Sequence, residues 1–225
     1  GGSRSYVKKL TAPFADRIRL GVGIAKVTRN DGRVQVTDTN GNTEEFDHIV
    51  IGAHSDEALA MLSDASEAEN RLLGAVRYGP NKVYLHRDPA LMPRRRRAWN
   101  YLSPGRIDKG SHLSVTYWMN QLQGIDEKYP LFVTLNPVAP PKANLTFAEL
   151  NYDHPMFDAQ ALDAQKEISS LQGQSNTWFC GAWLGYGFHE DGLSSGLDVA
   201  QMVLDANAGD AAAPASIEPF VEAAE

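Results

Sequence analysis

Residues 178–204, WFCGAWLGYGFHEDGLSSGLDVAQMVL, constrain the fold of this chain more than any other stretch. An aromatic strand over 178–180 is followed by a glycine-rich bend and then by a helix over 193–204. Glycines let the backbone approach a ligand closely, and a helix start offers unpaired N–H groups at the positive end of the helix dipole. This arrangement favours an anionic or electron-rich ligand. A bend that only joins two elements is the alternative, and the local chemistry does not separate the two.

The run His189-Glu190-Asp191 in this bend allows three interpretations. Adjacent residues do not share one face of a helix or strand, and no second His/Cys pair has ligand spacing, so a metal site is disfavoured. Glu190 or Asp191 can instead cap the helix N-terminus. His189 can act as a proton donor or remain an ordinary polar residue.

Strand and helix signals alternate at both ends of the chain. Spacing of apolar residues predicts a helix over 3–18, and NDG and NG turns predict hairpins between β-rich runs over 24–46. The unbroken apolar run 49–51 is typical of a buried parallel strand. A helix is predicted over 56–62, with Ser55 as its cap.

The middle of the chain has a different texture. Four segments, NKVYLHRD, RAWNYLS, SHLSVTYWMNQL and LFVTLNP, predict antiparallel strands. ELNYDHP is interpreted as a turn, and a helix is predicted over 153–173, closed by Gly173. His86 and His112 are expected to be satisfied sheet histidines. The aromatic residues either line an apolar cavity or, as we expect for any one of them, pack in the core: Tyr84, Trp99, Tyr101, Tyr117, Trp118 and Phe132.

Composition narrows the function classes. The net charge of −7 and the lack of a basic face argue against nucleic-acid binding. The run 94–97, RRRR, is expected to be a solvated loop, with phosphate or lipid headgroups as the alternative partners. No apolar run reaches the roughly 18 residues of a membrane helix. One cysteine, Cys180, fits a reducing compartment, so we expect a cytoplasmic protein, with attachment to a membrane periphery as the variant.

The segment FCGAW followed by HEDGLSSG resembles the C-terminal FAD signature of the flavin-containing amine oxidase superfamily, and most closely its bacterial branch of NAD/FAD-binding proteins. That superfamily includes amine oxidases and phytoene-desaturase-like enzymes. Three further segments match in order and spacing: GGSRSYVKKL, IRLGVGIAKV and FDHIVIGAH. The resemblance covers residues 1–87 and 176–206.

This resemblance implies non-covalent FAD. The backbone of Val22 would contact the adenine, and the strand before Gly52 would pass beneath the cofactor. Gly181 and Ala182 would follow the ribityl-pyrophosphate, and the helix start would face the flavin pyrimidine edge, where a reduced flavin is negative. The residues assigned to the cofactor are Val22, Gly52, Ala53, Gly181, Ala182, His189, Glu190 and Gly196.

Two departures from the family pattern limit what the chain does alone. It has no strand-GxGxxG-helix unit, which holds the FAD pyrophosphate, so we expect a C-terminal fragment that lacks an N-terminal FAD-binding segment and is inactive by itself. Its exposed sheet edge predicts a homodimer or aggregate of the fragment. The paired tyrosines that flank the flavin in amine-oxidising members are not evident, which leaves an amine substrate in doubt.

We therefore expect a mixed α/β fold: a partial FAD-binding domain over 1–76 and 176–206, an inserted antiparallel-sheet substrate domain over 77–175, and a mobile tail over 207–225. The expected function of the whole protein is FAD-dependent oxidation by hydride transfer from a substrate C–H to flavin N5. The substrate would be a small molecule, either an amine or an unsaturated lipid or isoprenoid. The alternative is a non-catalytic FAD-fold binding or interaction domain.

Overall fold

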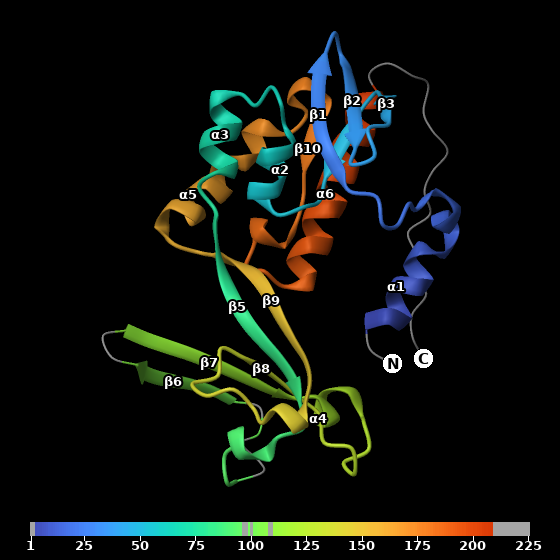
Figure 1. The fold of residues 1–225 in the computed structure, drawn as a ribbon. Coiled ribbons are helices and arrows are strands. Elements are labelled where there is room, and N and C mark those ends of the chain that lie inside the picture. The colour runs from blue at the N-terminus through green and yellow to red at the C-terminus, as the bar shows by residue number, and fades with distance from the viewer. Residues whose placement is uncertain (1–2, 96–98, 100, 108–109, 209–225) are drawn as a thin grey trace. The chain divides into compact units, whose positions relative to one another are not determined.

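The computed structural model describes residues 3–95, 99, 101–107 and 110–208 (Figure 1), although the side chains of residues 3, 101 and 102–112 are outside that description. The fold is mixed α/β, as predicted. The chain forms two compact units: one comprises Gly1–Leu20 and Tyr78–His154, and the other comprises Gly21–Arg77 and Pro155–Glu225. Most of the predicted tail, 209–225, lies outside the described residues. The predicted limits of the FAD-binding and substrate domains stay predictions.

The second unit begins with an antiparallel sheet of β1 (Ile24–Asn30), β2 (Arg33–Asp38) and β3 (Thr43–Phe46). The NDG turn has positive φ at Asp31 (50°) and Gly32 (75°), which is the backbone of a tight hairpin turn. Val27 on β1 and Val34 on β2 have no exposed surface, so they anchor the sheet in the core of the unit. The predicted hairpins are confirmed.

A second, parallel sheet pairs β4 (Ile49–Ile51) with β10 (Thr177–Phe179), which lie far apart in the sequence. The register places Thr177 opposite Ile49 and Phe179 opposite Ile51. Parallel strands are normally buried on both faces and are rich in β-branched residues. The apolar run 49–51 forms a parallel strand as predicted, but of its three residues only Ile51 is buried and Val50 is exposed.

Helices surround these sheets. The set consists of α2 (Ser55–Met61), α3 (Glu67–Leu73), α5 (Ala159–Glu167), the 3-10 turns η5 (Ile168–Leu171), η6 (Gln174–Asn176) and η7 (Ala182–Leu184), and α6 (His189–Ala208). In α3 the Ser66 side chain accepts from the N–H of Glu69, and the Glu69 carboxylate accepts from the N–H of Ser66, which is a capping box. Leu72 and Leu73, one turn further along, are buried on the same side of the helix as Glu69.

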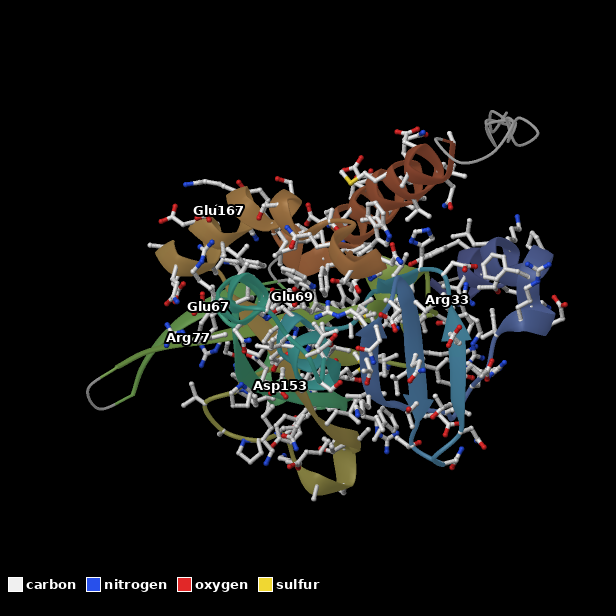
Figure 2. The ribbon with its side chains drawn as sticks, turned by 90° about the horizontal axis from the view of Figure 1, so that it is seen from above. Arg33, Glu67, Glu69, Arg77, Asp153 and Glu167 are labelled. Atoms are coloured by element: carbon white, nitrogen blue, oxygen red, sulfur yellow. The ribbon has the colours of Figure 1, made fainter. Side chains whose placement is uncertain are left out.

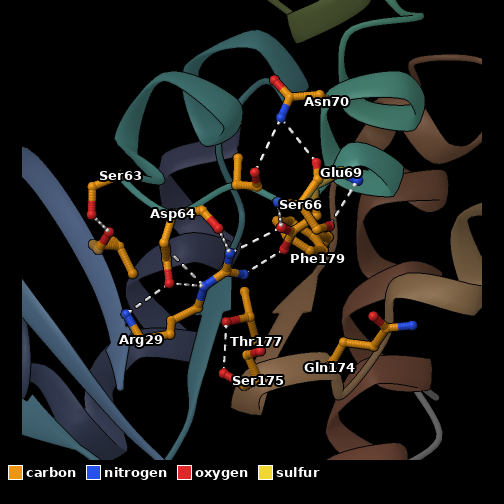
Figure 3. Close-up of polar contacts among 12 residues, drawn as sticks. Arg29, Ser63, Asp64, Ser66, Glu69, Asn70, Gln174, Ser175, Thr177 and Phe179 are labelled. Atoms are coloured by element: carbon orange, nitrogen blue, oxygen red, sulfur yellow. Dashed lines mark hydrogen bonds and ion pairs between the residues drawn. The ribbon is translucent and has the colours of Figure 1, made fainter.

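A buried ion-pair cluster joins the hairpin sheet to these helices (Figure 3). Arg29 on β1 bonds through Nη2 to Oε2 of Glu69 at 2.9 Å and through Nε to Oδ1 of Asp64 at 3.1 Å. The side chains of Arg29 and Glu69 are 5% and 4% exposed. By contrast, Glu167 on α5 (labelled in Figure 2) pairs with Arg71 at the surface, where such a pair contributes little.

In the first unit, α1 (Ser3–Thr11) continues into η1 (Ala12–Arg17), because Pro13 favours a tighter turn. The sheet of this unit has the strand order β6-β7-β8-β5-β9 among the described residues. Its strands are β5 (Arg77–His86), β6 (Tyr101–Ile107), β7 (Gly110–Trp118), β8 (Phe132–Leu135) and β9 (Thr146–Met156), with η2 (Pro89–Leu91), α4 (Met119–Gln123) and η4 (Ala143–Leu145) between them.

The two faces of this sheet differ. One face is covered: Met92, Trp118 and Phe132 form a buried cluster against which Trp99 packs, and Tyr84 is also buried. For these aromatic residues the core interpretation is confirmed. The other face carries Val115, Val133 and Leu135, which are only half-buried, and the exposed Leu113 and Tyr117. The side chain of Tyr101 lies outside the described part.

His86 lies in the covered face and is fully buried. Its Nδ1 accepts from the N–H of Asp88 at 3.1 Å, so its Nε2 carries the proton and donates to Oγ1 of Thr134 at 2.8 Å. Burial lowers the pKa of His86. The prediction of a satisfied sheet histidine is confirmed for His86, while the side chain of His112 is not described.

Three predicted boundaries are wrong. The segment ELNYDHP is not a turn but part of β9, and the helix predicted over 153–173 starts only at Ala159 and ends at Glu167. Pro155 is tolerated because β9 is an edge strand of the described sheet, where a missing N–H costs no ladder bond. Helix α6 begins at His189, four residues before the predicted start, because Asp191 organises the preceding loop.

Candidate functional site

The candidate site is the edge of the parallel sheet at which β4 and β10 both end. The carboxyl ends of parallel strands are the usual place for a ligand in α/β proteins. A Cβ built on Gly52, the residue after β4, would lie 3.5 Å from Sγ of Cys180, the residue after β10. The indole N–H of Trp183 donates to the carbonyl of Ala53 at 3.2 Å. The loops after the two strands are therefore joined directly.

The backbone conformation at position 181 requires glycine. Its φ of 150° and ψ of 162° lie in a region essentially restricted to glycine. A Cβ at this position would approach Nε1 of Trp183 to 2.7 Å. The expectation that Gly181 leaves room for a ligand is thus wrong on its Cβ side, because the Trp183 indole fills that space.

The loop between Gly181 and α6 is fixed by side chains from neighbouring elements. Nε2 of Gln165, on α5, donates to the carbonyls of Trp183 and Gly185 at 2.7 and 2.8 Å. The Gly181 N–H donates to Oγ of Ser195 at 3.0 Å, and this hydroxyl donates in turn to the Gly192 carbonyl at 3.0 Å. The bend is therefore a rigid structure that holds the first turns of α6 against the end of β10.

Asp191 organises the approach to α6 from inside the helix. Its Oδ2 accepts from the N–H groups of Tyr186 at 3.0 Å and Phe188 at 2.8 Å. It is the third helical residue rather than the N-cap, and it reaches back to the residue before the helix as the acid of a capping box does. A Cβ on Gly185 would collide with this carboxylate, so Gly185 makes room for Asp191 and not for a ligand.

The first-turn amides of α6 remain available. Within the described residues, the backbone N–H groups of Glu190 and Asp191 have no hydrogen-bond acceptor. Both are at the positive end of a 20-residue helix. The donor set at this edge thus fits an electron-rich group, since the Asp191 carboxylate is turned toward the loop and not toward these two amides.

The structure places the eight predicted residues in one unit but does not join all of them. Gly52 and Ala53 meet Gly181 and Ala182 where the two strands end. His189 and Glu190 form the exposed first turn of α6. Val22 is half-buried in the segment before β1, and among the described residues no hydrogen bond or ring contact links it to the strand ends. Which of the eight contact FAD stays a prediction.

Gly196 lies on an open face of α6. A Cβ there would meet no atom within 4 Å. Helical spacing places Leu193, Leu197 and Leu204 on the same side, and they are 54%, 62% and 39% exposed. This side lies opposite Ser195 and Val199, which face the rest of the unit. The described part of the chain therefore leaves an apolar helix face uncovered.

A hollow of about 300 Å³ lies on the other side of α6, between this helix, η5 and η7. Asp191, Ser195, Asp198 and Val199 line it, and none of the eight predicted residues does. The hollow is therefore distinct from the predicted flavin site.

Sequence reasoning missed three supporting residues: Gln165, Gln172 and Ser195. Each acts through its side chain on the backbone of a residue 7 to 20 positions away. Such contacts leave no short-range spacing signal, so only the fold reveals them.

Residues 1–124, more than half of the chain, match the model of the flavin containing amine oxidoreductase family. The chain belongs to this family. Members are flavin-containing amine oxidoreductases, and the mixed α/β fold described here agrees with that family. No curated protein matches the chain in sequence.

Solved structures share the fold at low sequence identity. A CLA-producing fatty acid isomerase from P. acnes is 15% identical, with a TM-score of 0.65 over 89% of this chain and 51% of that protein. A triple mutant of putrescine oxidase, redesigned in cofactor binding, is 11% identical, with a TM-score of 0.59 over 90% of this chain and 53% of that protein. The chain spans about half the length of the solved structures that it matches.

None of the described helices combines the length and apolarity that a bilayer crossing requires. Within the same residues, no group of three or more His, Cys, Asp or Glu side chains is arranged to hold a metal ion.

Proposed function

We propose that the chain is the C-terminal part of an FAD-dependent oxidoreductase. The observation that carries this proposal is the pair of unbonded amides of Glu190 and Asp191, at the edge where β4 and β10 end. The family match and the folds of the flavin enzymes support it. When bound, FAD supplies the redox chemistry by accepting a hydride from a substrate C–H at its N5 position.

The residues of this chain hold and tune the cofactor. Amides at the start of α6 donate to an electron-rich edge and favour negative charge there. Gly181 and Ala182, fixed by Trp183 and Ser195, form the rim along which the cofactor lies. A helix-end dipole gives charge stabilisation without a titratable group, so this site needs no base of its own.

Attachment of the flavin is non-covalent. Cys180 is the single cysteine, and burial raises the pKa of its thiol. A thiol that stays protonated is a poor nucleophile. Cys180 therefore fills space beside Gly52 and does not bond to the cofactor.

We propose an unsaturated apolar chain, such as a lipid or isoprenoid, as the substrate in preference to an amine. Among the described residues, the sheet face of the first unit opposite the Trp118 cluster carries the half-buried Val115, Val133 and Leu135, the exposed Leu113 and Tyr117, and the buried Val83. None of the residues of β5, β7 and β8 that the strand pairing places on this face is an acid that could pair with an ammonium group. An aliphatic wall binds hydrocarbon through the area that it removes from water.

Anaerobic titration of the intact protein, meaning the full product of the gene that encodes this chain, tests both statements. Unsaturated fatty acids should bleach the visible flavin band, and alkyl amines of equal length should not. Bleaching by amines alone would overturn the substrate class. A protein that contains no flavin would overturn the proposed function, and bound flavin that no donor reduces would favour the non-catalytic binding alternative.

A further inference from the structure

The hollow of about 300 Å³ beside α6 has no role in the proposed function. It lies between α6, η5 and η7, and the cofactor residues predicted from the sequence are not among those that line it. Since a water molecule takes up about 30 Å³ in the liquid, the hollow has space for roughly ten non-hydrogen atoms. All of its lining belongs to the second unit, so the hollow does not depend on how the two units are arranged.

The hollow has an apolar wall, formed by Ile168, Leu184, Val199 and Met202. Ile168 on η5 and Val199 on α6 are buried, with 8% and 2% of their surface exposed. Leu184 on η7 is half-buried, and Met202 on α6 is 39% exposed. Such a wall stabilises a hydrocarbon chain through the apolar area that it removes from water.

The charged groups of the lining are both negative. Asp191 and Asp198 lie two turns apart on one side of α6, and none of the eleven described residues that line the hollow is a lysine, arginine or histidine. Among the described residues Asp198 has no hydrogen bond or ion pair. Oδ2 of Asp191 accepts from the amides of Tyr186 and Phe188, whereas Oδ1 has no donor in the described part of the chain. Two carboxylates therefore line the hollow without a cation.

Other classes of ligand suit this lining less well. The two aspartates repel an anion, such as a phosphate or a fatty acid carboxylate. Mg²⁺ and Ca²⁺ require about six oxygen ligands around one point, whereas Asp191 and Asp198 are about 10 Å apart along the helix axis and share the hollow with apolar side chains. A neutral hydrocarbon leaves both carboxylates without a partner. The lining therefore favours an organic cation.

We propose that this hollow is a binding site for a small aliphatic ammonium compound. Its ammonium group pairs with Oδ1 of Asp191, and its carbon chain lies against the apolar wall. Asp198 strengthens the attraction through the field of its charge. The site is separate from the substrate site of the proposed function, so such a compound binds here without being oxidised.

Asp191 connects the hollow to the first turn of α6. Its carboxylate is a negative charge at the helix end that carries the unbonded amides of Glu190 and Asp191. An ammonium partner neutralises this charge, so the helix end becomes more positive. In the proposed flavin enzyme this change stabilises the reduced cofactor, and occupancy of the hollow should raise the reduction potential. The coupling rests on the proposed function, whereas the binding site does not.

Titration of the intact protein with n-butylammonium chloride tests the site, with the methyl resonances of Ile168, Leu184 and Val199 as the readout. We expect saturable shifts and a dissociation constant in the millimolar range, on the order expected for so small a ligand. Ethylammonium should bind about fourfold more weakly for each methylene group removed, and sodium chloride should give no saturable shift. Equal binding of the two ammonium ions, or no saturable shift with either, would overturn the proposal.

The variant Asp191→Asn removes the charge that the ligand needs. The amide oxygen can still accept from Tyr186 and Phe188, but the NH₂ group in place of Oδ1 cannot pair with an ammonium group. n-Butylammonium should bind about tenfold more weakly, as for a lost hydrogen bond to a charged group. Unchanged affinity in this variant would contradict the assignment. The amide resonances of Tyr186 and Phe188 show whether the loop is intact.

Asp198→Asn tests the site without touching the loop. Because Asp198 is exposed, its loss should weaken binding only about two- to fivefold. Asp205→Asn on the same helix is the matched control, since Asp205 pairs with Gln201 outside the hollow, and it should leave the affinity unchanged. Equal affinities of Asp198→Asn and Asp205→Asn would show that the hollow does not hold the cation.

The coupling to the flavin has its own readout. In the intact protein, saturating n-butylammonium should raise the two-electron reduction potential without bleaching the flavin, and Asp191→Asn should abolish this response. An unchanged potential at saturation would overturn the coupling. An intact protein that contains no flavin and still shows the methyl shifts would overturn the proposed function and support the binding site.

Discussion

Nη2 of Arg29 lies 2.9 Å from Oε2 of Glu69, and this buried ion pair joins β1 to α3 (Figure 3). Asp64 adds a second carboxylate to the same guanidinium. The cluster fixes β1 of the hairpin sheet to α3 and to the turn before that helix.

Glu69→Gln is expected to lower the free energy of unfolding by about 3 kcal/mol, the lower end for a broken buried pair, because Asp64 still compensates Arg29. Glu67→Gln on the same helix is the control: Glu67 is exposed (Figure 2) and should change stability by no more than about 0.5 kcal/mol. Urea unfolding measures both. Equal effects of the two variants would show that the buried pair is not special.

Acid sensitivity should follow from the same carboxyl group. Burial raises the pKa of Glu69, but hydrogen bonds from Arg29 and Ser66 outweigh it, so the pKa lies below its ordinary value. Stability from Glu69 is then present above the unfolded pKa of about 4.3 and is lost as the pH falls through the folded pKa. The difference in thermal stability between wild type and Glu69→Gln, measured by thermal unfolding from pH 7 to pH 3, should become smaller as the pH falls. A constant difference would contradict this assignment.

Two glycine-to-alanine changes should act in opposite directions. Gly181→Ala forces a Cβ against Trp183 at a φ of 150° and should cost about 1–3 kcal/mol. Gly196→Ala meets open space within a helix and should stabilise the 225-residue chain by about 0.5–1 kcal/mol. Chemical denaturation checks both, and destabilisation by Gly196→Ala would show that the α6 face is already packed.

Cys180 should be unreactive. Because burial raises the pKa of its thiol, labelling by a thiol reagent at pH 7 should be much slower in the native chain than in urea. In the intact protein, acid precipitation should leave all the flavin in the supernatant. Flavin that stays with the precipitated protein would contradict non-covalent binding.

Local sequence signals predicted the elements whose stability is local. The turn Asp31-Gly32 carries its own conformational requirement, and the apolar run 49–51 carries the pattern of a parallel strand. The same signals gave wrong predictions where pairing with a segment distant in sequence determines the secondary structure. Residues 146–156 form one strand because β5 pairs with them, although Asn151 and Pro155 favour a turn.

The sequence likewise indicated some residues of the candidate site and gave no signal for others. Gly52 and Gly181 were selected from the sequence as glycines at strand ends; the structure requires glycine by its backbone conformation at Gly181, and their contact with FAD stays a prediction. The sequence left Glu190 and Asp191 both open as N-caps; the structure makes Asp191 the third helical residue, which bonds back to the loop. Ser195 and Gln172 gave no signal, because each contacts backbone only through the fold.

The reduction potential of the flavin in the intact protein tests most directly whether the start of α6 faces the cofactor. Glu190→Pro removes one amide from the first helical turn, a position that tolerates proline, and Glu190→Gln keeps that amide as the control. Loss of about 0.3–1 kcal/mol of charge stabilisation should lower the two-electron potential of Glu190→Pro by roughly 6–20 mV relative to Glu190→Gln. Equal potentials in the two variants, or an intact protein that binds no flavin, would contradict the account.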